Sequence, residues 1–85
     1  MKVLIPSPLR PYTGQSRVDA AGDTLAAVLA ELDSRYPGIR FRMIDEQERI
    51  RPHMRFFIDG EQVRDLSRPV AASDELMIVQ ALSGG

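Results

Sequence analysis

The sequence predicts an α+β domain in which one sheet of four or five short strands carries one main helix on one of its faces. Two observations support this prediction. Residues 25–36 carry apolar side chains at helical spacing, and this is the clearest helix signal in the chain. Short apolar or alternating stretches lie on both sides of it, bounded by Pro, Gly and Asp, as is typical of strands and turns. The 85 residues suit a single domain with one modest core.

The first quarter of the chain predicts two strands joined by a loop. Residues 2–5 are a short apolar run that ends at a proline, and residues 16–20 are the second candidate strand. Between them, three prolines and Gly14 predict a loop over residues 7–15, because proline cannot donate to a ladder and glycine permits a turn.

The main helix is predicted to begin after Asp23 and Thr24, because either side chain can cap a helix N-terminus. It is predicted to end at Pro37-Gly38, since the residue before proline avoids helical angles. One stripe of this helix is apolar, and we expect it to face the core. Its members are Leu25, Val28, Leu29, Leu32 and Tyr36.

The second half predicts a sheet built around two longer strands. Residues 39–44 fit either a short helical turn or a strand. Alternation then predicts a regular strand over residues 54–58, followed by a tight turn at Asp59-Gly60 and a short paired segment near Val63. A connecting segment is expected over residues 65–73, and the last strand is predicted over residues 75–81.

The last strand has apolar side chains in both phases. Leu76 and Ile78 share one face, whereas Met77 and Val79 share the other, and Phe57 likewise points away from its two apolar neighbours. One interpretation is a central strand buried on both faces. The other is an outer sheet surface that is kept apolar to dock a partner.

Other chemistry is sparse in the sequence. The net charge is −1 and there is no cysteine, which argues against an electrostatic nucleic-acid binder, disulfides and thiolate chemistry. The single histidine, His53, has no partner for a metal site, so no metal is expected. Arg49, Arg51, His53 and Arg55 form a stripe that is either solvated or meets an anionic partner surface. No apolar stretch suits a membrane span or a signal peptide, so a cytoplasmic protein is expected.

The chain ends in Gly84-Gly85 after a run of mostly small residues. Glycine lacks a Cβ and takes backbone angles closed to other residues, so such an end can enter a narrow channel. Residues 81–85 reach about 16–18 Å when extended. One hypothesis is that the terminal carboxylate is the reactive group of this protein; the alternative is a frayed terminus.

The order of these elements, the helix entry at Gly22-Asp23-Thr24 and the terminal Gly-Gly together resemble the ubiquitin-like sulfur carriers, the MoaD/ThiS family. The opening, Ile5-Pro6-Ser7-Pro8-Leu9-Arg10-Pro11-Tyr12-Thr13-Gly14, is most similar to the CysO-type cysteine-biosynthesis carriers. The resemblance implies a β-grasp fold with a mixed sheet whose first and last strands are parallel neighbours. It also implies a domain over residues 1–80 and a flexible tail over residues 81–85.

The resemblance further implies a carrier and not an enzyme. An E1-like adenylyltransferase of the MoeB/ThiF type would use ATP to adenylate Gly85, and a sulfur donor would convert the adenylate to a thiocarboxylate. Sulfur would then pass to a cysteine-synthase-like enzyme, a thiazole synthase or the large subunit of molybdopterin synthase. No cofactor is expected to be bound to the chain itself. Gly84 would permit passage of the tail, and the expected partner-binding residues are Phe57, Met77, Val79, Ala81, Leu82 and Ser83.

The sequence departs from the family pattern at Leu82-Ser83, where Val-Ala or Ile-Ala is common, although Ser83 is still small. Three other functions stay open. These are the small subunit of molybdopterin synthase, a non-covalent ubiquitin-like interaction module, and a modifier that joins Gly85 to a lysine of another protein.

Overall fold

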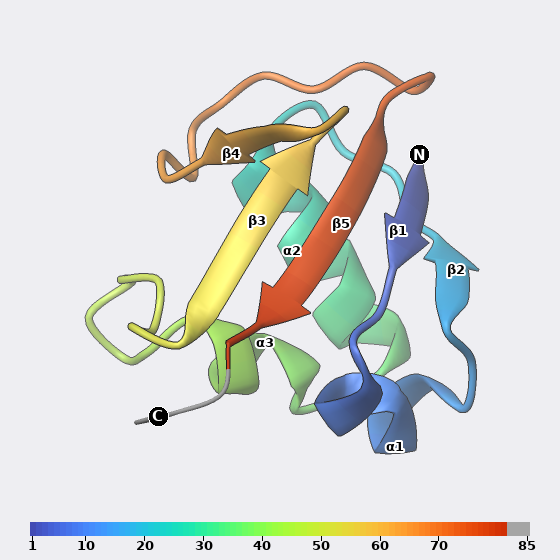
Figure 1. Ribbon diagram of the computed structural model, residues 1–85, viewed down its shortest axis with the longest axis vertical. Helices are drawn as coiled ribbons and strands as arrows, with labels where there is room; N and C mark the ends of the chain where they lie inside the picture. The colour runs from blue at the N-terminus through green and yellow to red at the C-terminus, as the bar shows by residue number, and fades with distance from the viewer. Residues whose placement is uncertain (82–85) are drawn as a thin grey trace.

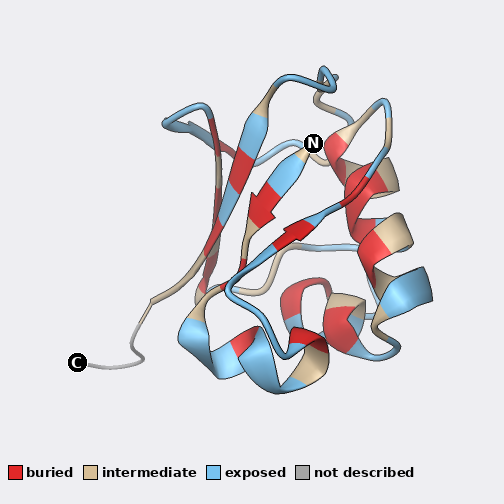
Figure 2. Ribbon diagram, turned by 90° about the vertical axis from the view of Figure 1, so that its right-hand side faces the viewer, coloured by how far each residue is buried: buried red, intermediate tan, exposed pale blue. Residues whose placement is uncertain are grey.

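The computed structural model describes residues 1–81 and shows a mixed five-stranded sheet with the order β2-β1-β5-β3-β4 (Figure 1). The main helix, α2, lies behind the sheet in this view, and Figure 2 shows the sheet and the helix as two layers. The strands are β1 (Lys2–Leu4), β2 (Arg17–Asp19), β3 (Met54–Ile58), β4 (Glu61–Val63) and β5 (Glu75–Gln80). The helices are η1 (Ser7–Leu9), α1 (Arg10–Thr13), α2 (Leu25–Arg35) and α3 (Ile39–Met43).

β5 occupies the centre of the sheet. It pairs in parallel with β1, where Val3 lies opposite Leu76, and antiparallel with β3, where Phe56 lies opposite Ile78. The outer pairs, β1 with β2 and β3 with β4, are antiparallel. The predicted α+β class is confirmed, as are the mixed sheet and the parallel first and last strands that the family resemblance implies.

Local chemistry explains where α2 begins and which way it faces. Thr24, not Asp23, is the N-cap: its side-chain oxygen accepts a hydrogen bond of 3.2 Å from the backbone N–H of Ala27. The predicted apolar stripe faces the sheet, with four of its members fully buried and Tyr36 half-buried against the core. The four buried members are Leu25, Val28, Leu29 and Leu32.

Two predictions for the regions flanking α2 need correction or resolution. The loop predicted over residues 7–15 is wrong, because η1 and α1 occupy most of it. Pro8 lies in the first turn of η1 and Pro11 in the first turn of α1. A backbone N–H in the first turn has no partner within the helix, so proline, which lacks it, is tolerated there. The ambiguous segment at residues 39–44 is helical over α3, and its Ile39 and Met43 are buried.

The turn between β3 and β4 is confirmed at Asp59-Gly60. Both residues have positive φ, 49° and 86°, as a two-residue hairpin turn with matching twist requires. The Asp59 side chain also accepts a hydrogen bond of 2.9 Å from the backbone N–H of Glu75. The turn is thereby joined to the start of β5.

Gly22 lies where the chain turns into α2, and a Cβ at this position would lie 2.7 Å from the backbone nitrogen of Val28. We expect Gly22→Ala to lower the free energy of unfolding by about 1–3 kcal/mol, because the helix backbone cannot move aside without losing contacts. Chemical denaturation measures this change. Ala21→Ser adds an atom at the exposed neighbouring position and serves as the control, with an expected change of about 0.5 kcal/mol or less. Equal stability of the two variants would contradict the packing argument.

Candidate functional site

The sheet face opposite α2 carries a row of apolar side chains across its three central strands. Met77 on β5 lies in register with Leu4 on β1 and with Phe57 on β3. Met77 is 38% exposed, while Leu4 and Phe57 are half-buried. Val79, also half-buried, continues the surface toward the end of β5. These four residues, Leu4, Phe57, Met77 and Val79, are called the outer apolar face below.

This arrangement decides between the two interpretations of the last strand. The first interpretation is correct that β5 is a central strand. Its prediction that β5 is buried on both faces is wrong, because Leu76 and Ile78 are buried whereas Met77 between them is exposed. α2 covers only the other face of the sheet (Figure 2). The predicted outward direction of Phe57, Met77 and Val79 is therefore confirmed. Their contact with a partner stays a prediction.

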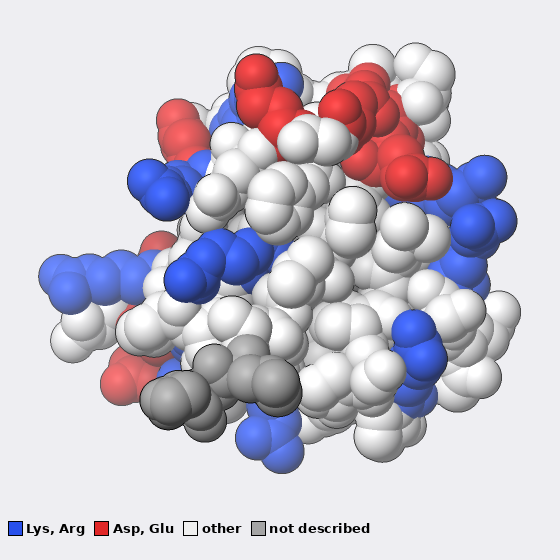
Figure 3. All heavy atoms as spheres, viewed as in Figure 1, with Lys and Arg blue, Asp and Glu red and all other residues white. Residues whose placement is uncertain are grey.

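Charge is distributed unevenly around the outer apolar face. Uncharged atoms fill most of the middle of this side of the molecule, and acidic side chains gather at the end where β5 begins (Figure 3). Basic side chains lie along its flanks and toward the opposite end. Arg55 on β3 belongs to this basic set, because it is in register with Val79 on the same face. A partner that approaches the face therefore meets an apolar centre with an acidic group at the end where β5 begins and mostly basic side chains along the flanks (Figure 3).

The root of the predicted tail is fixed by one backbone hydrogen bond. The N–H of Ala81 donates to the carbonyl oxygen of His53, with a distance of 2.7 Å, just beyond the Gln80–Met54 pair of the ladder. Ala81 therefore leaves the sheet at the end of β5, near the outer apolar face. Leu82, Ser83, Gly84 and Gly85 lie outside the described residues. The division into a domain over 1–80 and a tail over 81–85 stays a prediction.

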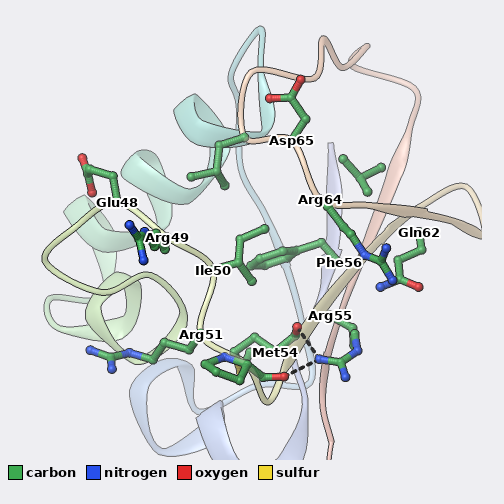
Figure 4. A pocket seen from close by; sticks show the side chains of 13 residues that line it. Glu48, Arg49, Ile50, Arg51, Met54, Arg55, Phe56, Gln62, Arg64 and Asp65 are labelled. Carbon is green, nitrogen blue, oxygen red and sulfur yellow. Dashed lines mark hydrogen bonds between the residues drawn. The ribbon is translucent and has the colours of Figure 1, made fainter.

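A depression of about 680 Å³ lies beside β3 and β4 (Figure 4). Ile50 and Phe56 form its apolar centre, while Arg55 and Arg64 lie on one flank. Arg55 is held by the carbonyl oxygens of Pro52 and Met54. Two carboxylates, Glu48 and Asp65, also line the depression, and Glu48 is paired with Arg40.

The loop before β3 is fixed by Asp45. Its carboxylate accepts hydrogen bonds from the backbone N–H groups of Gln47 and Arg49, at 2.8 and 3.0 Å. The Arg49 hydrogen bond in particular holds the pKa of Asp45 below its ordinary value, so the anchor is ionised at neutral pH. The N–H of Arg51 then donates to the carbonyl oxygen of Met43, at 2.9 Å. The loop therefore delivers Arg51 and His53 to the end of the sheet where the tail begins.

Over residues 1–81, no group of three or more His, Asp or Glu side chains is placed to hold a metal ion. Within the same residues, no helix has the length and apolar character that crossing a membrane requires. The basic stripe predicted from the sequence is divided by the fold. Arg51 and His53 belong to the turn before β3, while Arg55 points from β3 onto the outer face.

Comparison with known proteins places this geometry in a family. The model of the ThiS family matches residues 3–85. The chain belongs to the ThiS family. The recognised resemblance to the ubiquitin-like sulfur carriers is thus confirmed, and the match spans both the sheet and the terminal Gly-Gly.

Individual members of the ThiS family are similar over nearly the whole chain. The sulfur carrier protein CysO of Mycobacterium bovis is 38% identical over 89 residues, which cover 98% of this chain and 96% of the relative. The crystal structure of Mycobacterium tuberculosis CysO has a TM-score of 0.89 and 36% identity, and covers 95% of this chain and 98% of that chain. CysO in the crystal structure of the BexX/CysO complex of Amycolatopsis orientalis has a TM-score of 0.91 and 33% identity. This match covers 99% of this chain and 98% of that chain. The β-grasp fold follows from these matches.

Sequence reasoning missed Leu4 as a member of the outer apolar face. Successive residues of a strand point to opposite faces, so Leu4 points away from the core because its neighbour Val3 is buried. Three residues are too short a run for alternation to be read without the strand partners.

Adjacent residues on β5 test the two faces directly. Ile78 is 2% exposed, and we expect Ile78→Ala to lower the free energy of unfolding by about 2–5 kcal/mol because it leaves a cavity in the core. Met77→Ala removes an exposed side chain, and we expect a change of about 0.5 kcal/mol. Denaturant unfolding of both variants gives the comparison. A loss at Met77 as large as at Ile78 would show that this face is covered in the folded chain.

Proposed function

We propose that this ThiS-family chain is a sulfur carrier whose reactive group is the C-terminal carboxylate of Gly85. The observation that carries the proposal is the similarity to CysO sulfur carriers over 98% of this chain, together with the match of the ThiS family model through Gly85. The geometry of the described residues supports it, because β5 ends beside an exposed apolar face and leads directly into the tail. The chain acts as a co-substrate of partner enzymes.

Activation is required because the carboxylate is ionised at neutral pH and is a poor electrophile. In an E1-like adenylyltransferase of the MoeB/ThiF type, a carboxylate oxygen of Gly85 attacks the α-phosphorus of ATP and pyrophosphate leaves. A sulfur nucleophile then attacks the acyl carbon of the adenylate and AMP leaves. With hydrogen sulfide as the nucleophile, loss of the proton on sulfur leaves the chain ending in a thiocarboxylate. ATP is consumed by the partner enzyme, and the chain itself holds no cofactor.

The contribution of this chain is presentation of its terminus. Gly84 and Gly85 add no Cβ atoms, so they suit a channel too narrow for larger residues. Ala81, Leu82 and Ser83 connect them to the sheet. The hydrogen bond from Ala81 to His53 fixes where this connection starts, so the domain stays outside the channel while the carboxylate enters it.

The outer apolar face is the proposed docking surface for these enzymes. Phe57 and Met77 are adjacent in register and Val79 lies nearer the tail root. Burial of these side chains in an interface removes apolar area from water and favours binding. Met77 suits a surface that meets more than one enzyme, because its unbranched thioether adapts to different shapes.

For the sulfur acceptor, the proposal favours a cysteine-synthase-like enzyme. The support is the similarity to CysO, together with the resemblance of residues 5–14 to the CysO-type carriers. A thiazole synthase or the large subunit of molybdopterin synthase is the alternative. The structure of a CysO in complex with BexX supports the use of a partner enzyme by a protein of this kind.

Intact mass spectrometry tests the proposed chemistry. The chain is incubated with an E1-like adenylyltransferase that is active on a CysO carrier, together with ATP and sulfide. We expect a mass increase equal to the difference between sulfur and oxygen, because one terminal oxygen is replaced. Omission of ATP removes the increase.

The matched control is the chain without Gly85, which keeps all of the described residues 1–81 and should stay at its original mass. A CysO carrier in a parallel reaction shows that the enzyme is active. An unchanged mass of the full chain beside a converted CysO carrier would contradict sulfur carriage and favour a non-covalent interaction module.

A further inference from the structure

A second depression, of about 600 Å³, lies between α1, α3 and the turn before β3, immediately beside the end of β5. It is called the tail-root groove here. The residues used in the argument are Tyr12, Phe41, Arg42, Arg51, His53 and Gln80. Gln80 is the last residue of β5, so the groove borders the point where the tail begins.

The groove combines an exposed aromatic ring with two positioned arginines. Phe41 is 57% exposed, more than any other large apolar side chain of residues 1–81. The guanidinium of Arg51 lies 4.6 Å from the centre of the Phe41 ring, and its Nε donates to the Phe41 carbonyl oxygen at 2.7 Å. On the other side, Arg42 donates from Nε to the hydroxyl of Tyr12, also at 2.7 Å.

These contacts orient the two arginines without neutralising them. The ion pairs of the described residues involve Arg35, Arg40 and Arg68. Within residues 1–81, no carboxylate lies within 4.0 Å of Arg42 or Arg51. Each of these two uses Nε for an internal hydrogen bond, which leaves the two terminal nitrogens to face an acceptor from outside. A guanidinium held this way is suited to bidentate binding of a carboxylate.

The position of the groove indicates which protein would occupy it. An enzyme that takes up the tail must place the mouth of its channel against the surface around Ala81. The groove forms part of this surface, because Gln80 lines it and Ala81 is bonded to the adjacent His53. The enzyme thus contacts the groove at the same time as the outer apolar face.

We propose that the tail-root groove binds an acidic segment at the channel mouth of the adenylyltransferase, with carboxylates on Arg42 and Arg51 and an apolar side chain on Phe41. The proposal rests on the proposed function, since it takes the enzyme that receives the tail as the partner. The groove is a second, charge-selective contact in addition to the apolar one. It discriminates among partners because an enzyme with a basic or neutral channel mouth leaves both arginines unpaired.

Binding of variants to the E1-like adenylyltransferase tests this assignment. The variants are Phe41→Ala and the double charge reversal Arg42→Glu/Arg51→Glu. The double reversal Arg35→Glu/Arg64→Glu, at exposed positions outside the groove, changes the net charge equally and is the matched control. Thermal unfolding of each variant establishes that it is folded. The dissociation constant is measured at low and at high ionic strength.

We expect the groove reversal to weaken binding about tenfold or more at low salt, with a smaller effect at high salt, while the control reversal stays near the wild-type value. Phe41→Ala should weaken binding at both salt concentrations. If the groove reversal and its control bind equally and the wild-type chain still acquires the thiocarboxylate, the groove assignment is wrong and sulfur carriage stands. If the wild-type chain neither binds the enzyme nor acquires sulfur, both proposals are overturned.

Two other occupants are distinguished by NMR of the free chain. The signals of the Arg51 Nε–H and of the Tyr12 and Phe41 rings should be unchanged by deletion of Gly84 and Gly85, and unchanged by dilution. A shift on deletion would assign the groove to the chain's own tail. A shift on dilution would assign it to a second copy of the chain. Either result overturns the proposed partner.

Discussion

The position of β5 between β1 and β3 is the constraint on which the rest of the structure depends. The last strand is held on one side by a parallel ladder to the first strand and on the other by an antiparallel ladder to β3. The first and last strands are therefore joined at the sheet centre, where paired backbone groups on both sides of β5 make local opening costly. A segment that follows this strand starts from a fixed point and direction, although it is itself outside the core.

The same placement explains why one small domain can present a docking surface without losing its core. α2 covers one face of the sheet and buries Leu76, Ile78 and Phe56 against its apolar stripe. The opposite face keeps Met77 and Phe57 at the surface of the central strands. The binding chemistry thus lies on the reverse of the residues that stabilise the fold, so that surface can vary with little effect on the free energy of unfolding.

Much of the fold was accessible from the sequence because its strongest patterns are local. Alternation predicted the observed bounds of β3, and Asp23-Thr24 with the following apolar stripe predicted the start of α2, although the structure was needed to identify Thr24 as the cap. The short helices η1 and α1 were missed because proline in a first helical turn carries the same local signal as proline in a loop. The outward direction of Phe57, Met77 and Val79 followed from phase alone. The tail-root groove could not be predicted in this way, since it requires Tyr12 to contact Arg42 and requires Gln80 and His53 to line the same depression.

The central claim is that this domain meets its activating enzyme through the outer apolar face of the sheet, with the tail root at the edge of the contact. Methyl cross-saturation NMR tests it most directly: a protonated E1-like adenylyltransferase is irradiated while bound to a deuterated, methyl-labelled chain. The account predicts saturation at Met77, Val79 and Leu4, and none at Val28, Leu29 and Leu32 on the buried side of α2. Saturation confined to the α2 side, or absent from Met77 and Val79 in a saturated complex, would contradict the account.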